Sequence, residues 1–233
     1  MKIADSVALV TGSNRGMGKQ FAQQLLARGA AKVYATARNP ESIDIPGVEA
    51  LRLDITDPAS VAEVAAVAQD VTLLINNAGI NTTSNLVTGE LDKIRLDMET
   101  HFFGTLNVVR AFAPILGANG GGAILNNVSA LSWFAFNGVN AYGAAKSAEW
   151  ALTNGIRLEL AEQGTLVTAV HAGSVDTDMM AGYDVPKTDP AEVVRLALDG
   201  IENGKLEVLA DEWSAYVKAS LANDPAEFYQ QQV

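Results

Sequence analysis

Residues 7–18 read VALVTGSNRGMG, an aliphatic run that leads directly into a turn with three glycines. The run predicts a buried strand, and the turn opens a helix expected over residues 16–28. Gly12, Gly16 and Gly18 permit a tight turn, close approach of the backbone to a pyrophosphate, and close packing of helix on strand. The spacing is G-x-x-x-G-x-G, and three glycines also suit an ordinary strand-to-helix turn. The dinucleotide interpretation therefore depends on the rest of the chain.

Further apolar runs follow the first, and each is separated from the next by a segment with helical spacing. Because these runs are continuous, they predict strands buried on both faces, as in a parallel sheet. The runs are 32–37, 48–54, 71–79, 122–129, 166–173 and 206–210, and helices are expected over 58–69, 90–116, 141–163, 190–203 and near 211–222. This alternation predicts an α/β fold, a Rossmann-type doubly wound parallel sheet of about seven strands with helices on both faces.

No linker or internal repeat interrupts this alternation, so we expect one domain over residues 1–233. Its cofactor half covers about 1–125 and its catalytic and substrate half about 126–233. In such folds ligands bind outside the carboxyl ends of the strands. The residues that follow each apolar run are therefore the candidates for function.

Composition excludes several classes of protein. The chain has 233 residues, 16 Lys+Arg against 27 Asp+Glu, a net charge of −11, two histidines and no cysteine. We expect no nucleic-acid partner, because phosphate binding needs a basic face, and no metal site, because thiolates are absent and imidazoles scarce. No stretch approaches the roughly 20 apolar residues that a membrane helix needs. Without a signal-like N-terminus, a cytoplasmic protein without membrane contact is expected.

The end of the second predicted strand indicates which dinucleotide would bind. NAD specificity usually depends on an Asp or Glu there, which accepts a hydrogen bond from the ribose 2′-hydroxyl. Here the strand ends Ala35-Thr36-Ala37-Arg38, without a carboxylate. Arg38, together with Arg15 in the glycine turn, supplies guanidinium groups of the kind that hold a 2′-phosphate. We therefore predict NADP(H) as the cofactor.

Tyr142 and Lys146 form the candidate catalytic pair. Their spacing of four places them on one face at the start of a helix, and a nearby ammonium favours the phenolate, so Lys146 is expected to lower the pKa of Tyr142. Ser129 lies thirteen residues upstream, at the end of a predicted strand. A Tyr and a Lys at this spacing are also common on a solvated helix face. The combination with Ser129 and the glycine turn favours catalysis.

Taken together, these residues resemble the short-chain dehydrogenase/reductase family, of the NADP-preferring carbonyl reductase type, over nearly the whole chain. The motifs that carry the resemblance follow the predicted strands in the family's order. They are Thr11 to Gly18, Asp54, Asn76-Asn77-Ala78-Gly79, Ser129, Tyr142-x-x-x-Lys146 and Gly173 to Thr177. The resemblance implies a cofactor site made of Gly12, Ser13, Asn14, Arg15, Gly16, Met17, Gly18, Arg38, Asp54, Ile55, Asn77, Ala78, Gly79, Tyr142, Lys146, Gly173, Val175 and Thr177.

The resemblance also implies roles. Tyr142 would donate a proton to a substrate carbonyl oxygen while the nicotinamide delivers hydride to its carbon. Ser129 would hydrogen-bond the same oxygen, and Lys146 would hold the nicotinamide ribose. The other implied contacts are Asp54 with the adenine, Asn77 to Gly79 beside the adenosine ribose and the central strand, and Thr177 with the carboxamide or pyrophosphate.

The sequence departs from the family pattern at two positions. His101 stands where the family carries an Asn that positions a water in a proton relay, and Ala172 stands where a Pro usually precedes Gly173. An imidazole exchanges protons near neutral pH, so His101 is a fourth candidate catalytic residue. Simple packing of His101 inside the helix is an equal alternative.

The residues after Ser129 and after the sixth strand are expected to form the substrate pocket. They are apolar and partly aromatic, which favours a small hydrophobic ketone, aldehyde or alcohol, although such side chains also pack between helices. The predicted pocket residues are Trp133, Phe134, Phe136, Met179, Met180 and Tyr183. Outward apolar residues on the two long helices favour a homodimer or homotetramer.

The leading interpretation is an NADPH-dependent oxidoreductase that reduces ketones or aldehydes reversibly. A 3-oxoacyl-(acyl carrier protein) reductase is a second possibility, disfavoured because an acidic chain suits an acidic carrier protein poorly. A non-catalytic NADP(H)-sensing regulatory protein of the same fold is a third. A sensor has no need of Ser129, Tyr142 and Lys146.

Overall fold

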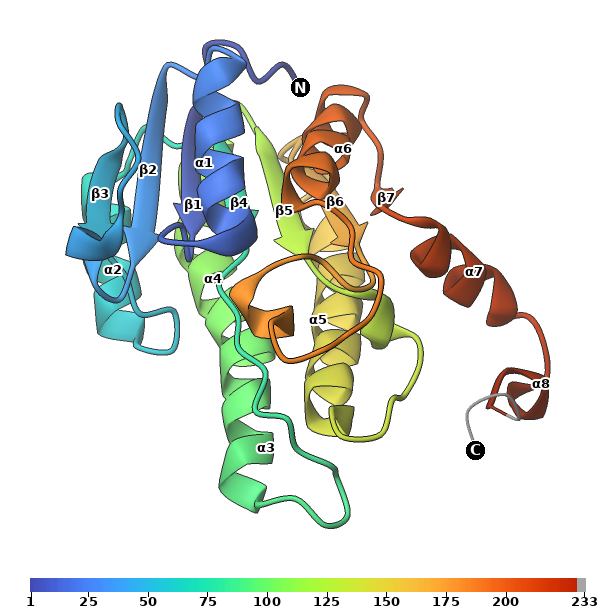
Figure 1. The fold of residues 1–233 in the computed structure, drawn as a ribbon. Helices are drawn as coiled ribbons and strands as arrows, with labels where there is room; N and C mark the ends of the chain where they lie inside the picture. Colours follow the sequence, from blue (N-terminus) through green and yellow to red (C-terminus); the bar gives the residue numbers. More distant parts are fainter. Residues whose placement is uncertain (230–233) are drawn as a thin grey trace.

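Short apolar segments of the chain pair side by side into one parallel sheet. The computed structural model describes residues 1–229, and in these the sheet has seven strands in the order β3-β2-β1-β4-β5-β6-β7 (Figure 1). The strands are β1 (Val7–Thr11), β2 (Lys32–Ala37), β3 (Glu49–Arg52), β4 (Leu73–Asn76), β5 (Ala123–Asn127), β6 (Leu166–His171) and β7 (Glu207–Leu209). The predicted doubly wound, Rossmann-type fold is confirmed.

Helices cover both faces of the sheet and bury two separate apolar layers. On one face, Phe21 of α1 and Val193 of α6 pack on the strands. On the other, Val64 of α2, Phe112 of α4 and Ile156 of α5 do the same, and Figure 1 shows α1 and α6 in front of the sheet. The helices are α1 (Gly16–Ala27), α2 (Pro58–Val67), α3 (Leu91–Met98), α4 (Thr105–Ala118), α5 (Asn140–Glu159), α6 (Pro190–Glu202), α7 (Glu212–Ser220) and α8 (Pro225–Tyr229).

Two predicted elements need correction. The segment 48–54 was expected to be buried on both faces, but β3 is an edge strand and Glu49, Ala50 and Arg52 are exposed. The single helix expected over 90–116 is α3 and α4 joined by a π-helical segment, Glu99–Gly104. An extra residue per turn there turns His101 and Thr100 inward.

The chain's carboxyl end extends beyond the sheet. Helices α7 and α8 follow β7 and project to one side of the body (Figure 1), and α8 was not anticipated from the sequence. The last four residues of the predicted domain, 230–233, lie outside the described residues. Among residues 1–229, no helix combines the length and the apolar character needed to cross a membrane.

Candidate active site

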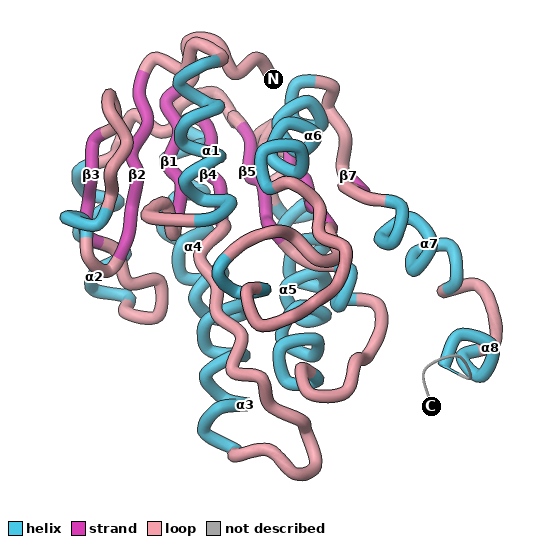
Figure 2. The backbone as a smooth tube through the Cα atoms, viewed as in Figure 1, coloured by secondary structure: helices cyan, strands magenta, loops and turns pink. Residues whose placement is uncertain are grey.

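The chain reverses its direction of winding at β1, whose neighbours are β2 on one side and β4 on the other. Ligands of doubly wound sheets bind at such a switch point, beyond the carboxyl ends of the strands. A cavity of about 470 Å³ lies there, within the usual range of ligand sites, ~300–1,000 Å³. Figure 2 shows the loop between β6 and α6 curling across this edge of the sheet.

Most of the predicted site residues line this one cleft. It contains the glycine turn, the ends of β2 and β4, Ser129 and the start of α5. The predicted residues in its lining are Gly12, Asn14, Arg15, Gly16, Met17, Gly18, Arg38, Asp54, Ile55, Asn77, Ala78, Gly79, His101, Ser129, Tyr142, Lys146, Gly173, Val175, Thr177, Met179 and Met180. Segments separated by more than a hundred residues therefore meet at one site.

The glycine turn forms a cradle that side chains would fill. A Cβ on Gly18 would lie 2.0 Å from the carbonyl oxygen of Gly12, and Gly12 itself adopts a φ of +68°. The first turn of α1 has no side-chain cap and no acidic residue. Its free backbone N–H groups and the positive end of the helix dipole suit a phosphate. These residues thus fit the pyrophosphate of a dinucleotide.

Ser13 is the one predicted cofactor residue that does not line the cleft. Its hydroxyl donates to the carbonyl oxygen of Val10 at 2.8 Å, and its own N–H donates to Thr36. The side chain is fully buried, because it joins the turn to β2. The Ser13 side chain therefore makes its contacts within the protein and does not face the cleft.

Asn77 fastens the end of β4 to both neighbouring strands. Its side-chain amide donates to the carbonyl oxygens of Thr11 and Gly12 at 3.0 and 3.2 Å, and its Oδ1 accepts from Asn127 at 3.1 Å. The Thr11 hydroxyl accepts in turn from the backbone N–H groups of Asn77 and Ala78. This network holds the glycine turn against the central strands. Asn77 therefore supports these strands through hydrogen bonds within the protein.

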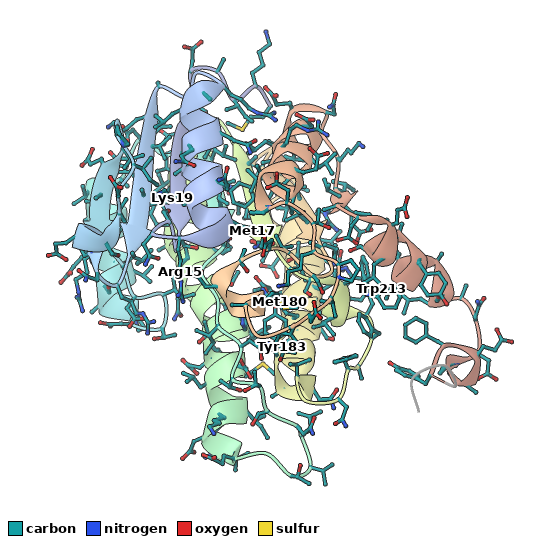
Figure 3. All side chains as sticks on the ribbon, in the orientation of Figure 1. Arg15, Met17, Lys19, Met180, Tyr183 and Trp213 are labelled. Atoms are coloured by element: carbon teal, nitrogen blue, oxygen red, sulfur yellow. The ribbon has the colours of Figure 1, made fainter. Side chains whose placement is uncertain are left out.

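Two arginines lie on the side of the cleft formed by β1 and β2. Arg38 follows β2 directly, is exposed and lines the cleft. Arg15 lies in the glycine turn and pairs with Asp178 at 3.4 Å, with 71% of each side chain exposed. An ion pair this exposed is weak, on the order of 0–1 kcal/mol. Arg15 is therefore available to an anionic ligand, and Figure 3 shows it beside the start of α1.

The candidate catalytic residues meet at the other end of the cleft. Ser129 follows β5, and Tyr142 and Lys146 lie in the first two turns of α5. The Lys146 Nζ donates to the carbonyl oxygen of Asn127 at 2.8 Å, and it lies 5.7 Å from the centre of the Tyr142 ring. Lys146 is almost completely buried, so the alternative of a solvated Tyr–Lys helix face is wrong.

The pKa of Tyr142 differs from expectation. Burial raises it most, the charge of Lys146 lowers it, the carboxylate of Glu149 raises it, and a hydrogen bond with Ser129 lowers it. The net direction is above the ordinary value of 10.0. Lys146 lowers the pKa as expected, but burial and the Glu149 carboxylate, which the expectation left out, outweigh its effect. Tyr142 is a protonated phenol at neutral pH, the form that donates to a carbonyl.

His101 lines the cleft and also contacts its neighbours Ile80 and Tyr142. Its Nε2 lies 2.7 Å from the carbonyl oxygen of Ile80, and its ring packs edge-on against Tyr142 with centres 5.1 Å apart. Burial and the charge of Lys146 hold its pKa well below 6.5. His101 is therefore neutral at pH 7, and the argument that it exchanges protons near neutrality is wrong. The packing contact is present, whereas a relay role remains a prediction.

Two of the six predicted substrate-pocket residues line the cleft, and the other four do not. Met179 and Met180 line the cleft, and Figure 3 shows Met180 on the loop across its opening. Trp133 instead stacks on His171 with ring centres 3.8 Å apart, and Phe134 packs edge-on against Trp213 at 5.6 Å. Phe136 and Tyr183 are exposed and do not line the cleft. The aromatic residues after Ser129 turn toward α7 because the short helix Ala130–Ser132 redirects the chain.

Two buried acids near the catalytic residues were missed. Glu149 lies three residues after Lys146 and Asp97 lies on α3, and they are 2% and 0% exposed. The spacing of Glu149 from Lys146 was a signal that could have identified it, since residues three apart share a helix face. Other cleft residues without a prediction include Ile80, Asn81, Leu96, Thr100 and Leu131.

Comparison with known proteins agrees with this geometry. The family model described as short chain dehydrogenase matches residues 6–186. A short chain dehydrogenase of Burkholderia cenocepacia J2315, solved in complex with NADP, is 38% identical, with a TM-score of 0.95, covering 99% of this chain and 98% of that one. A short-chain dehydrogenase of Sphingobium yanoikuyae, solved with NADPH, is 28% identical, with a TM-score of 0.79 and coverages of 93% and 94%.

Sequence relatives agree as well. The NADPH-dependent 1-acyldihydroxyacetone phosphate reductase of Schizosaccharomyces pombe is 34% identical over 76% of this chain and 62% of its own length. An uncharacterized oxidoreductase of Staphylococcus aureus (strain MW2) is 29% identical over 84% of this chain and 90% of its own. With a glycine cradle, a Ser–Tyr–Lys group in the same cleft and a family match over most of its length, this chain belongs to the short-chain dehydrogenase family of oxidoreductases.

Proposed function

We propose that this oxidoreductase is an NADPH-dependent reductase of ketones and aldehydes, reversible toward the alcohols. The observation that carries the proposal is the convergence of Ser129, Tyr142 and Lys146 in the cleft that also contains the glycine cradle. A bound nicotinamide would supply the hydride. Tyr142, protonated at neutral pH, donates the proton to the carbonyl oxygen, and Ser129 donates a hydrogen bond to the same oxygen. Lys146 holds the ribose with its remaining N–H.

The cofactor preference follows from the two arginines. The end of β2 places Arg38 in the cleft lining, and the glycine turn contributes Arg15. Arg38 and Asn39 directly follow β2, and neither supplies the carboxylate that NAD-specific sites use. Two structures similar to this chain hold NADP or NADPH. These observations favour NADPH over NADH.

Replacing Arg38 with Asp is expected to reverse the preference. The substitution removes a charge-assisted hydrogen bond to the 2′-phosphate, worth about 1.5–3 kcal/mol, so kcat/KM with NADPH falls by about 10- to 100-fold. The new carboxylate accepts from the 2′-hydroxyl of NADH, and kcat/KM with NADH rises. Steady-state rates with both cofactors measure the change. Arg52→Asp, an exposed position on β3 outside the cleft, is the matched control, and an unchanged ratio in Arg38→Asp contradicts the assignment.

The catalytic end of the cleft favours a neutral, apolar substrate. Leu96, Leu131, Met179 and Met180 line the cleft, and the buried cation there, Lys146, is already paired with Glu149. Among residues 1–229, this part of the lining has no unpaired cation that would neutralise a substrate carboxylate. A carrier-protein substrate is disfavoured by the net charge of −11, and a pure NADP(H) sensor by the presence of the Tyr142–Lys146–Ser129 group.

The experiment that tests the proposed function is loss of NADPH absorbance with a panel of alkyl and aryl ketones and aldehydes. Turnover with uncharged members and weak turnover with keto acids are expected. Tight NADPH binding without turnover across the panel would instead favour the regulatory protein.

We also propose a homodimer or homotetramer. Phe103 in the π segment and Leu158 on α5 leave 45% and 79% of their surface exposed, and burial of these side chains against a second copy of the chain would be favourable. Light scattering is expected to give a multiple of 24.5 kDa, reduced in Leu158→Glu. A mass of one chain for the unaltered protein contradicts this proposal.

A further inference from the structure

A buried carboxylate lies directly behind the catalytic lysine. The Oε2 of Glu149 is 2.6 Å from the Nζ of Lys146, and Oε1 accepts from the Thr105 hydroxyl at 3.4 Å. The Nδ1 of His101, buried and without a hydrogen-bond partner among residues 1–229, faces the same carboxylate at 3.8 Å. Glu149 is therefore at the centre of a closed polar cluster, and none of the mechanism described above uses it.

The position of Glu149 has a physical cost that its partners must offset. A carboxylate removed from water without partners costs several kcal/mol. Here the ammonium of Lys146 and the hydroxyl of Thr105 supply the donors. The offset is mutual, since Lys146 is equally buried and its charge is compensated by the same contact. The two residues form one buried ion pair within α5.

The ion pair limits how many N–H donors of Lys146 remain for a group in the cleft. An ammonium has three N–H donors. One is accepted by the carbonyl oxygen of Asn127 at 2.8 Å and a second by Glu149 at 2.6 Å. One donor therefore remains for a group in the cleft. Without Glu149, the flexible four-carbon chain of Lys146 would be held at a single point.

The same carboxylate acts electrostatically on Tyr142. The charge of Lys146 lowers the pKa of Tyr142, whereas Glu149 and, more weakly, Asp97 raise it. Glu149 also raises the pKa of Lys146 against the opposing effect of burial. His101 in the π segment and Tyr142 and Lys146 on α5 are the titratable groups that act on or face Glu149, and Asp97 on α3 acts on Lys146 and Tyr142.

We propose that Glu149 is a positioning residue, which orients the Lys146 ammonium and determines the pH at which the Tyr142–Lys146 pair releases its first proton. The proposal rests on the reductase function proposed above. Glu149 does not line the cleft, and its effect reaches the reacting atoms through Lys146.

Glu149→Gln tests this directly, because the amide keeps the size and hydrogen-bonding reach of the side chain and removes its charge. Loss of the negative charge lowers the pKa of a neighbouring phenol and that of a neighbouring ammonium. The first proton therefore leaves the pair at lower pH, whichever group it leaves. The alkaline limb of kcat/KM for ketone reduction is expected to move down by about one pH unit. Glu159→Gln, an exposed acid at the end of the same helix, is the control and is expected to leave the limb in place.

Glu149→Asp separates charge from position. It retains the carboxylate but shortens the side chain by one methylene, so the alkaline limb is expected to stay while KM for NADPH rises, because Lys146 is held less well. If Glu149→Gln does not fold, Glu149→Asp carries the test alone, and a limb displaced by about one unit or more with the charge retained overturns the proposal.

The phenolate gives a reading that needs no turnover. The absorbance of ionised tyrosine, taken as the difference between each protein and its Tyr142→Phe version, is expected to appear at lower pH in Glu149→Gln. If the protein shows no turnover but the phenolate still appears at lower pH in Glu149→Gln, the result counts against the proposed function and supports the role of Glu149. An active enzyme whose rate profile and phenolate titration are both unmoved in Glu149→Gln overturns the role of Glu149 and leaves the reductase function intact.

Discussion

Tyr142→Phe is expected to lower kcat for ketone reduction by about 10²- to 10⁴-fold, the usual contribution of a positioned general acid. Phenylalanine keeps the ring that packs against His101 and lacks only the hydroxyl. The fold and the affinity for NADPH are therefore expected to remain, so the loss appears in kcat. The measurement is NADPH consumption at saturating cofactor, with NADPH binding followed separately by fluorescence.

Tyr216→Phe is the matched control for this change. Tyr216 lies on α7, is 48% exposed and does not line the cleft, so the same loss of a hydroxyl there is expected to leave the rate unchanged. A Tyr142→Phe protein with nearly full activity would show that the phenol is not the proton donor.

Lys146→Met is expected to have the largest effect on stability. Removing the ammonium leaves Glu149, 2% exposed, without its counter-charge. Breaking a buried pair in this way costs about 3–5 kcal/mol, which lowers the melting temperature by roughly 10 °C in a chain of this size. Burial already raises the pKa of Glu149 above the ordinary 4.5, and loss of the ammonium is expected to raise it further. The loss is therefore smallest below that pH, where the group is protonated in both states, and grows as the pH rises.

A second substitution is expected to restore much of the stability. In Lys146→Met with Glu149→Leu, both charges are gone and the site is apolar, which removes the penalty for the unpaired carboxylate. Lys93→Met is the control, because its pair with Glu90 is exposed and such pairs contribute about 0–1 kcal/mol. Melting curves for the three variants measure the effect, and a single Lys146→Met variant as stable as Lys93→Met would contradict the buried ion pair.

Much of the fold could be predicted from the pattern of apolar runs, because strands buried on both faces and helices with one apolar face differ in periodicity. The two corrections concern features that the spacing of apolar residues does not encode. An apolar run cannot reveal that β3 lies at the sheet edge, since its neighbours are set by the strand order. Nor does helical spacing show that residues 99–104 widen into a π-helical turn, because an extra residue in a turn leaves the pattern on either side intact.

The parts of the site that depend on local backbone geometry could be predicted from the sequence. The glycine turn and the Tyr142–Lys146 spacing each depend on a few consecutive residues, and the structure brings both into one cleft. The substrate pocket depends on where a loop turns, and Trp133 and Phe134 turn toward His171 and Trp213. The pKa direction of Tyr142 depends on burial and on Glu149. Those contributions arise only when α3, the π segment and α5 pack together.

The most direct test of the account is to follow the hydride itself. NADPH carrying deuterium on the transferred position of the nicotinamide is incubated with the protein and a reactive ketone, and the product alcohol is analysed by mass spectrometry. An alcohol with deuterium on the former carbonyl carbon is expected, formed by the unaltered protein and almost absent with Tyr142→Phe. NADPH that binds in the cleft while no alcohol in the ketone panel acquires the label would contradict it.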